Sequence, residues 1–460
     1  MRFVFAAVAV AVTVAVFVVA AVALAHPASG AVFPLKTADN GRYLVDQDGK
    51  PFLVVGDSAW SLVVQLGDAD IDRYLNDRQK RGFNSIIVSL IEHKFCNVPP
   101  KTRSGLAPLT KAGDFSTPNP DYFDFARKVV KKANDHGIVV WLFPAYLGYG
   151  GGDEGWFKEM KAGGRAALRS YAKFVGRRFK DLPNIVWGLG GDFIPNEEDR
   201  WTVTEIARGI RDEDADHLMT AHGSRGKRVA PGLGDPDWLA VNTTYTDASN
   251  LVELTQMEYE RRPVRPFVLI EAIYEGEHDS TPDQIRRQAY LTMLGGACGQ
   301  FFGNNPIWHF DGPGLFPTKT NWKEALDGTG SRDMARLRDL FGGLAWHKLE
   351  PERNHAIVTG GYGVEIITAL TARTPDKRLA VTYIPSTGTE SRSLTIDLAR
   401  FSGPITARWY NPTSGHWTTI NDVPLANRGS HTFHTFKTPG DNGTKTNDWL
   451  LVLEARGQRR

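Results

Sequence analysis

Between residues 52 and 347, short apolar runs typical of buried strands alternate with longer segments whose apolar residues recur at helical spacing. This alternation is typical of parallel βα units. Eight such units over roughly 290 residues match the size of a (β/α)8 barrel. We therefore predict an α/β fold with a (β/α)8 TIM barrel over residues 33–347. Its eight predicted strands are Phe52–Val55, Phe83–Leu90, Ile138–Phe143, Ile185–Leu189, Leu218–Ala221, Leu239–Val241, Phe267–Ile270 and Gln300–Phe302.

The intervening helices are marked by caps and by apolar stripes. Pro120 suits the first position of a helix after Asn119, and His136-Gly137 ends that segment. Further helices are predicted along the stripe from 168 to 179, after Thr281-Pro282 and over 333–344. An open doubly wound sheet is the alternative, but no Gly-x-Gly-x-x-Gly follows the first run, so nothing indicates a dinucleotide site.

Two other parts of the chain have strand character without helices between the strands. Residues 41–52 read as a hairpin around Asp48-Gly49, which we expect to close the bottom of the barrel. From residue 348 onward, strand-like runs recur about every ten residues, which predicts a small all-β sandwich over residues 348–460. These runs are 356–359, 364–371, 379–384, 393–398, 405–410, 431–435 and 449–454.

The chain begins with Met1-Arg2 and an uncharged apolar run from Phe3 to Ala25. Ala23-Leu24-Ala25 offers a small-x-small cleavage site, so residues 1–25 are predicted to be a signal peptide. The run is also long enough to span a bilayer, which leaves an uncleaved membrane anchor as the alternative. In both cases the globular part is predicted to be secreted or extracytoplasmic.

Composition narrows the partners. Lys+Arg 54 against Asp+Glu 52 gives a formal charge of +2, so no global field attracts nucleic acid. A neutral substrate is the default, and the 12 Trp and 13 Tyr include enough aromatic surface for carbohydrate stacking. We expect a carbohydrate substrate, no nucleic-acid partner and no cofactor; the sequence does not indicate an oligomeric state.

Active sites of such barrels lie at the carboxyl ends of the strands. Residues of suitable chemistry follow almost every predicted strand: Asp57, Trp60, Glu92, His93, Tyr146, Asp192, His222, Tyr245, Glu271, Asn304 and Trp308. Two of them are carboxylates after strands four and seven, where many retaining glycosidases place an acid/base and a nucleophile. Asp192 ends Gly190-Gly-Asp192, a pattern that on its own more often marks a turn or a cap. Glu271 emerges from an apolar strand.

We therefore predict Asp192 and Glu271 as the catalytic pair, with carboxyl groups roughly 5 to 5.5 Å apart. Asp57, His93, His222 and Tyr245 are candidates for binding sugar hydroxyls, and Trp60 and Trp308 for stacking on a ring. Tyr146 and Asn304 complete the predicted substrate-binding set.

Three stretches also resemble a known family. They are Gly56-Asp-Ser-Ala-Trp60, the segment 184–192 with its Trp-x-x-Gly-Gly-Asp ending, and Pro266-Phe-Val-Leu-Ile-Glu271. Together they are similar to the apiosidase-like glycoside hydrolases, a barrel family with an appended β-sandwich that is sometimes labelled collagen-binding. The resemblance covers residues 33–458 and implies acid/base work for Asp192 and nucleophile work for Glu271. It does not imply specificity for apiose, and nothing in these residues supports collagen binding.

Two other functional classes remain open. A noncatalytic cell-surface carbohydrate-binding protein could use the same barrel, although degenerate barrels tend to lose one of the two carboxylates. A metal-dependent hydrolase needs a cluster of ligands that His93 and His222 do not make, so no metal site is predicted.

Cys96 and Cys298 are the two cysteines of the chain. Cys298 precedes predicted strand eight, at the bottom of the barrel, and Cys96 follows strand two, at the top. Even a four-residue strand separates the rims by over 10 Å, and a disulfide tolerates about 7 Å between Cα atoms. We predict two unpaired thiols.

Overall fold

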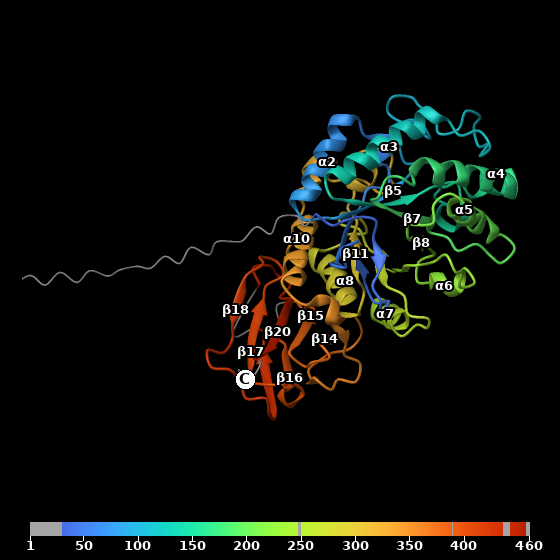
Figure 1. Ribbon diagram of the computed structural model, residues 1–460. Coiled ribbons are helices and arrows are strands. Elements are labelled where there is room, and N and C mark those ends of the chain that lie inside the picture. Colours follow the sequence, from blue (N-terminus) through green and yellow to red (C-terminus); the bar gives the residue numbers. More distant parts are fainter. Residues whose placement is uncertain (1–29, 247–249, 389, 436–441, 457–460) are drawn as a thin grey trace, which may run out of the picture.

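A computed structural model gives the arrangement of residues 30–246, 250–388, 390–435 and 442–456 (Figure 1). Its first part is a sheet of eight parallel strands in the order β8-β7-β6-β5-β4-β11-β10-β9. A parallel bridge between Thr220 and Val241 joins the two end strands, so the sheet nearly closes into a barrel and the predicted fold class is confirmed. The strands are β4 Val54–Ser58, β5 Ser85–Ser89, β6 Val139–Phe143, β7 Ile185–Gly190, β8 Met219–His222, β9 Asn242–Tyr245, β10 Phe267–Glu271 and β11 Gly299–Phe302.

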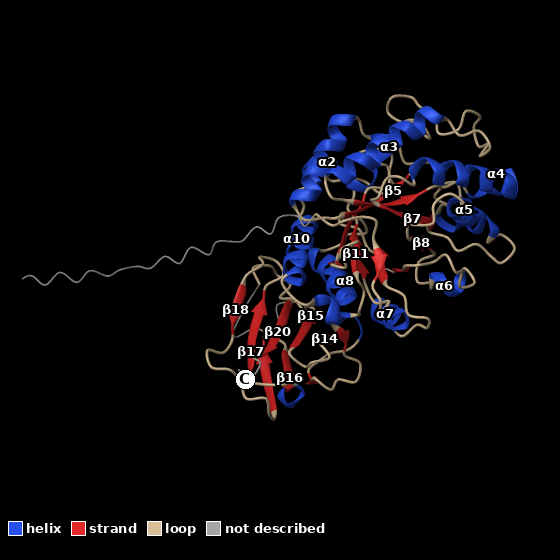
Figure 2. Ribbon diagram, in the orientation of Figure 1, coloured by secondary structure: helices blue, strands red, loops and turns tan. Residues whose placement is uncertain are grey.

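Helices cover the outside of this barrel (Figure 2). The predicted helix start at Pro120 is confirmed: α3 begins there, and the Asn119 side chain accepts the N–H of Asp121 at 3.2 Å. The helices are α1 Leu62–Gln65, α2 Asp68–Lys80, α3 Pro120–Asp135, α4 Phe157–Phe179, α5 Trp201–Arg211, α6 Val229–Gly232, α7 Leu251–Tyr259, α8 Pro282–Leu294, α9 Trp322–Ala325 and α10 Thr329–Gly342.

Strand six lies three residues later than the sequence predicted, over β9 Asn242–Tyr245 instead of 239–241. Its residues are polar but fully buried, and most of their polar side-chain atoms have partners inside the barrel wall; Asn242 Oδ1 has none among the described residues. The Thr243 hydroxyl donates to the Ala221 carbonyl at 2.6 Å, and the Asn242 amide donates to Glu258 at 2.7 Å. A hydrophobic criterion misses such a strand because its polar groups have partners within the protein.

Strand one is also displaced, from the predicted 52–55 to β4 Val54–Ser58, which takes Asp57 into the strand. A Cβ at Gly56 would lie 2.1 Å from the Phe301 ring, so position 56 faces the barrel interior. Because side chains alternate along a strand, Asp57 points outward, toward α2. There Asp57 Oδ2 accepts the Tyr74 hydroxyl at 2.8 Å and pairs with Arg78 at 3.3 Å. The prediction that Asp57 binds substrate is therefore wrong.

The bottom of the barrel is closed by the predicted hairpin, here β2 Leu44–Val45 and β3 Pro51–Phe52, with β1 Lys36–Thr37 beside it. Leu44 and Phe52 belong to the same apolar cluster as Cys298 and the inward-facing strand residue Val186. Cys298 is buried in this floor, and Cys96 is buried in the separate cluster under the helices. Both cysteines are free, as predicted.

The second part of the chain is a pair of antiparallel sheets, a small β-sandwich as predicted. Residues 364–371 were expected to form one strand, but a 3-10 turn, η4 Glu365–Ile367, comes first because Val364 and Ile366 face solvent. The larger sheet contains β12 Glu350–Pro351, β14 Leu370–Arg373, β15 Leu379–Ile384, β20 Trp449–Ala455, β17 Ile405–Tyr410 and β18 Trp417–Thr419. The smaller contains β13 Val358–Gly360, β16 Ser393–Asp397 and β19 Ser430–His434.

The larger sheet is buried on both faces. Ala380 and Ile384 pack against the smaller sheet, while Val381 and Tyr383 pack against the barrel helices α8 and α10. Arg286 of α8 links the two parts through a 2.7 Å ion pair with Asp448. The sandwich is thus fixed to one side of the barrel, beneath α8 and α10 in Figure 1.

Among the described residues, no helix combines the length and the apolar character that crossing a membrane requires. The predicted signal segment, residues 1–25, lies outside the described residues.

Candidate active site

A small pocket opens at the carboxyl ends of the barrel strands and contains both predicted catalytic carboxylates. Its cavity volume is about 70 Å³. A cavity that encloses a benzene molecule measures about 150 Å³, so this pocket can enclose only part of one sugar residue. Its lining consists of Trp60, Ser89, Glu92, Phe95, Tyr146, Glu154, Asp192, Glu271, Tyr274, Glu277, Trp308 and Leu315.

Asp192 is presented by a turn that requires both preceding glycines. Gly190, Gly191 and Asp192 all have positive φ, of 80°, 121° and 51°. A Cβ at Gly191 would lie 2.2 Å from the ring of Tyr146, and one at Gly190 would lie 2.4 Å from the His222 carbonyl oxygen. Only glycine fits at these two positions, and the turn brings the Asp192 carboxyl over the barrel mouth.

Glu271 is the last residue of β10. The pairing of β10 with β9 shifts between Leu269 and Glu271, so that Glu271 lies opposite Tyr245. A β-bulge of this kind re-aims the side chain at the end of a strand. Glu271 therefore enters the pocket from the side opposite to β7, as the sequence predicted.

His222, the last residue of β8, lies behind the two carboxylates and contacts both segments. Its Nδ1 accepts the backbone N–H of Asp192 at 2.9 Å, and its Nε2 lies 2.7 Å from Glu271 Oε2. Because a backbone N–H can only donate, Nδ1 is the acceptor and the proton of the neutral imidazole is on Nε2. His222 therefore donates a hydrogen bond to Glu271. On the other side, the Tyr146 hydroxyl donates to Asp192 Oδ2 at 2.5 Å.

The negative charge of Asp192 influences the ionisation of Glu271. An oxygen of Asp192 and an oxygen of Glu271 lie within 4.8 Å of one another. Burial, and then the negative charge of Asp192, raise the pKa of Glu271, and the hydrogen bond from His222 opposes this rise without cancelling it. Two carboxylates in such a site keep a shared proton to higher pH than one isolated carboxyl would.

The same three residues could in principle be considered as metal ligands, since Asp192, His222 and Glu271 each offer an atom within 4.8 Å of the others. The hydrogen bonds argue against this use. A histidine ligand needs a free lone pair, whereas Nδ1 of His222 already accepts an amide N–H and Nε2 carries the proton donated to Glu271. The donor set therefore fits a carboxylate pair oriented by a histidine and does not fit a metal site.

Aromatic side chains wall the pocket. The ring centroid of Trp60 lies 5.0 Å from that of Phe143 and 5.6 Å from that of Tyr146. Its indole N–H donates to the Tyr274 hydroxyl at 3.1 Å. Trp308 packs 5.0 Å from Phe95. The predicted stacking residues Trp60 and Trp308 thus both line the pocket.

Tyr245, the last residue of β9, stands behind His222 with ring centroids 5.0 Å apart. Its hydroxyl accepts a hydrogen bond from Arg225 at 3.0 Å.

Two further predicted residues lie outside the pocket lining. His93 Nε2 contacts Glu159 at 3.1 Å and its ring packs against Trp156. The Asn304 amide donates to Glu275 at 2.8 Å. Both tie loops together. The predicted residues that do not line the pocket are thus Asp57, His93, His222, Tyr245 and Asn304, of which His222 contacts Asp192 and Glu271 from behind. Glu92 does line it, although its Oε1 is occupied by the backbone N–H groups of residues 93, 94 and 95.

The sequence analysis missed Tyr274, Glu277 and Arg225. The first two lie in the loop after β10, three and six residues beyond Glu271, and Arg225 lies three residues beyond His222. These three residues were not among the candidates after the predicted strands, because no periodicity marks residues within a loop. The one available signal was the density of Tyr and Glu in the segment 274–277.

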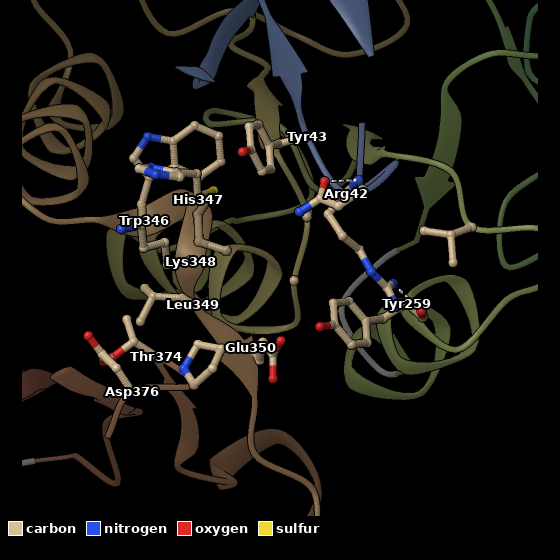
Figure 3. Close-up of a pocket in the computed structure, with 16 residues that line it drawn as sticks. Arg42, Tyr43, Tyr259, Trp346, His347, Lys348, Leu349, Glu350, Thr374 and Asp376 are labelled. Atoms are coloured by element: carbon tan, nitrogen blue, oxygen red, sulfur yellow. Dashed lines mark hydrogen bonds between the residues drawn. The ribbon is translucent and has the colours of Figure 1, made fainter. Parts of the chain in front are cut away.

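A larger cleft of about 580 Å³ lies at the opposite end of the barrel, where the floor meets the second domain (Figure 3). Figure 3 shows Tyr43 beside Trp346 on one side and Arg42 beside Tyr259 on the other. The Arg42 guanidinium stacks 3.9 Å over the Tyr259 ring. The lining of this cleft includes the cations Arg42 and Lys348 and the carboxylates Glu350 and Asp376. It contains neither predicted catalytic carboxylate, so the smaller pocket is the better candidate for chemistry.

Comparison with known proteins agrees with this geometry. Residues 38–348 match the family described as "Apiosidase-like, catalytic domain", and residues 358–454 match "Putative collagen-binding domain of a collagenase". A comparison with curated proteins gives no match.

Solved structures resemble the whole chain. One described as "Glycoside hydrolase" has 23% identity and a TM-score of 0.78, with 93% of this chain and 98% of that chain covered. A glycoside hydrolase family 5 protein from Bacteroides vulgatus also has 23% identity and a TM-score of 0.78, with 92% and 93% covered. At this identity the likeness shows the fold. The family match spans the entire barrel, including both carboxylates, and the chain therefore belongs to the apiosidase-like family of glycoside hydrolases.

Proposed function

We propose that this protein is an exported glycosidase that cleaves a glycosidic bond with retention of configuration. The observation that carries the proposal is the approach of an Asp192 oxygen and a Glu271 oxygen to within 4.8 Å at the barrel mouth. Retaining enzymes hold their carboxyl groups about 5–5.5 Å apart, whereas inverting enzymes leave about 6.5–9.5 Å for a water molecule. The spacing supports direct attack by Glu271.

The reaction then has two steps. Glu271 attacks the anomeric carbon while Asp192 gives its proton to the departing glycosidic oxygen. The aglycone departs as an alcohol, and the sugar is bound to Glu271 as a glycosyl ester. Asp192, now ionised, takes a proton from water, whose oxygen attacks the same carbon and releases Glu271. The product is the free sugar with its original configuration, and both carboxyl groups return to their starting states.

The hydrogen bonds support this division of roles. The N–H that His222 donates favours the ionised form of Glu271, which is the form needed for attack. The proposed mechanism requires the acid proton on Asp192, whose Oδ1 is buried and has no hydrogen-bond partner among the described residues. A proton on this oxygen is free to be given to a substrate oxygen in the pocket.

The substrate that we propose is a compact, neutral sugar of furanosyl type in a plant or bacterial cell-wall glycan. The pocket volume of about 70 Å³ and the short side chain of Asp192 favour a small sugar held close to the strand ends. The formal charge of +2 gives no preference for charged polymers, and the apolar segment 3–25 supports export, as an extracellular glycan requires.

A noncatalytic binding protein is the weaker explanation of the site. Placing Asp192 beside the half-buried Glu271 costs free energy, because the negative charge of Asp192 disfavours ionisation of Glu271. A binding protein has no need of this arrangement, whereas a retaining glycosidase depends on it.

The proposal is tested by incubating the protein without residues 1–25 with aryl furanosides and with cell-wall glycans of plants and bacteria. We expect release of sugar from at least one of them and no release by Glu271→Gln, which keeps the shape of the side chain. Release that persists in Glu271→Gln would contradict the proposed mechanism, and no release from any glycan by the wild type would contradict the proposed substrate class.

A further inference from the structure

A third carboxylate enters the catalytic pocket from the loop between β10 and α8. Glu277 lines the same pocket as Asp192 and Glu271. Its loop is held by internal hydrogen bonds: the Ser280 hydroxyl donates to the Tyr274 carbonyl at 2.8 Å and accepts the N–H of Gly276 at 3.1 Å, and the N–H of Glu277 donates to the Tyr274 carbonyl at 3.2 Å. The side chain is thus presented from a fixed loop.

One oxygen of Glu277 is engaged and the other is not. Oε1 accepts the indole N–H of Trp308 at 2.9 Å. Within the part of the chain that the structure describes, neither a hydrogen bond nor an ion pair engages Oε2. Burial raises the pKa of Glu277 to about 7. Holding the ionised carboxylate at this position therefore costs free energy, and among the described residues no cation offsets that cost by direct contact.

Other buried carboxylates of this protein are built differently. Asp57 pairs with Arg78, Glu258 pairs with Arg228 at 2.8 Å, and Asp448 pairs with Arg286. In these three carboxylates a cation offsets the burial, and Glu92 has three backbone N–H donors instead, whereas Glu277 has an indole on one side and the pocket on the other.

The pocket limits what Glu277 can meet. Its volume of about 70 Å³ leaves room for no more than one sugar residue, and Trp60, Phe95 and Trp308 wall it. A sugar residue whose anomeric carbon is placed between Asp192 and Glu271 fills this space and presents its hydroxyl groups to the walls. A carboxylate accepts hydrogen bonds from two neighbouring hydroxyl groups, and charge makes such bonds strong.

We propose that Glu277 recognises a pair of adjacent free hydroxyl groups on a single terminal sugar residue, which makes the enzyme exo-acting. The substrate class is thereby a glycan whose non-reducing end carries an unsubstituted, compact sugar with a vicinal diol. This rests on the proposed function, because it uses the position of the sugar between the two catalytic carboxylates. Glu277 binds the sugar, and Trp308 orients Glu277.

The variant Glu277→Gln tests this role, because it keeps the shape and the oxygen that accepts the Trp308 N–H. The matched control is Asp279→Asn, in the same loop; Asp279 is exposed and has a φ of 51°, a conformation that asparagine tolerates. A hydrogen bond to a charged group contributes about 1.5–3 kcal/mol, equivalent to about 10- to 100-fold in affinity.

We measure kcat and KM with an aryl glycoside of the released sugar and with its monodeoxy analogues. We expect Glu277→Gln to lower kcat/KM by about 10- to 100-fold, mainly through KM, and Asp279→Asn to leave it unchanged. Removing one hydroxyl of the diol should weaken the wild type but not Glu277→Gln. Equal sensitivity of the two proteins to the deoxy analogues would overturn the proposal, since a merely structural effect does not change selectivity.

A binding measurement separates this proposal from the proposed function. Calorimetric titration of Glu271→Gln with free L-arabinose and D-apiose should show binding that the additional change Glu277→Gln weakens at least about tenfold. If these sugars bind in this way but no glycan is cleaved by the wild type, the hydrolytic function fails and the role of Glu277 stands. If the wild type cleaves glycans and Glu277→Gln cleaves them equally well, the role of Glu277 is overturned. Release of internal fragments by the wild type would likewise overturn it, because the proposal requires an exo-acting enzyme.

Discussion

Asp57 is buried and the pair formed by Asp192 and Glu271 is half-buried, and although all three are carboxyl groups at barrel strands, their surroundings are opposite. Asp57 faces outward and has a cation, Arg78, at 3.3 Å and a hydroxyl donor, Tyr74, at 2.8 Å. Asp192 and Glu271 face each other across the barrel mouth, with neutral donors, Tyr146 and His222, behind them. In the first arrangement a cation offsets part of the cost of burying a charge, whereas in the second the negative charge of Asp192 raises the pKa of Glu271.

The difference follows from where each residue lies on its strand. Asp57 lies within β4, where alternation turns it to the helix layer, whereas Glu271 ends β10 behind a bulge and Asp192 follows β7 after two glycines. Burial alone therefore does not identify a catalytic carboxylate in this barrel. A like-charged neighbour and a strand end together do.

The largest effect is expected from Glu271→Ala, which removes the nucleophile. Turnover should fall by about 10⁴-fold or more with every substrate, whatever the leaving group, because no covalent intermediate can form. The measurement is kcat/KM for aryl glycosides of graded leaving-group acidity and for a natural glycan. Substantial activity with the activated substrates would place the nucleophile elsewhere.

Asp192→Ala should have a large effect that depends on the leaving group. Hydrolysis of natural glycans should fall by about 10²- to 10⁴-fold, because these alcohols need a proton to leave, whereas kcat/KM for dinitrophenyl glycosides should fall less than about tenfold. If the loss is the same for activated and natural leaving groups, Asp192 is not the acid.

An intermediate effect is expected from His222→Phe, which keeps an aromatic ring beside Trp60 and Tyr245 and removes both nitrogens. The His222 hydrogen bond lowers the pKa of Glu271, so its loss raises that pKa further. Attack needs ionised Glu271, so the acidic limb of the kcat/KM profile should move to higher pH, with a loss of about 10- to 100-fold near neutrality. An unchanged acidic limb would show that His222 does not act through Glu271.

The smallest effect on activity, but a large one on stability, is expected from Arg78→Met. Leaving Asp57 buried without its cation should cost about 3–5 kcal/mol of the free energy of unfolding. The folded protein should keep its kcat, because the pair lies outside the pocket. The additional change Asp57→Asn should recover part of the lost stability.

The pH dependence of that stability has a defined sign. Burial raises the pKa of Asp57 to about 6 in the folded protein, while Arg78 opposes the rise, and about 3.9 is expected when unfolded. The folded state holds the extra proton between these values, so this group's stabilisation is present below pH 4 and is lost as pH rises through 6. Arg78→Met should extend this loss toward neutral pH. Chemical denaturation between pH 4 and 8 measures it, and a loss of kcat in the folded variant would mean that the two clusters are not separate.

Patterns of apolar residues predicted the barrel, the sandwich and the helix that begins at Pro120, because burial of apolar side chains drives all three. They failed where polar residues are buried with partners inside the protein, as in β9 Asn242–Tyr245, and where apolar residues are exposed, as at Val364 and Ile366. The nearly continuous apolar runs of β15 and β20 indicate strands that are buried on both faces. A sheet with apolar residues on both faces predicts a second partner, here the helices α8 and α10.

The site was predicted where the residue ends a strand or directly follows one. Asp192 and Glu271 meet as the sequence indicated, since parallel strands bring their carboxyl ends to one rim. Asp57 was misplaced because the strand begins two residues later than predicted. This shift leaves the apolar pattern of the strand unchanged, but it places Asp57 inside the strand, in the barrel wall. Glu277 was missed because loop conformation places it, and six residues of loop have no periodicity to predict.

The most direct test of the paired-carboxylate mechanism is the anomeric configuration of the sugar that is first released. Proton NMR of the anomeric signal measures it during the first minutes of hydrolysis of an aryl glycoside. Two carboxyl groups that approach within 4.8 Å predict that the first product has the same anomeric configuration as the substrate and converts only later to the equilibrium mixture. First appearance of the opposite anomer would contradict the account, because it would require a water molecule where the structure places Glu271.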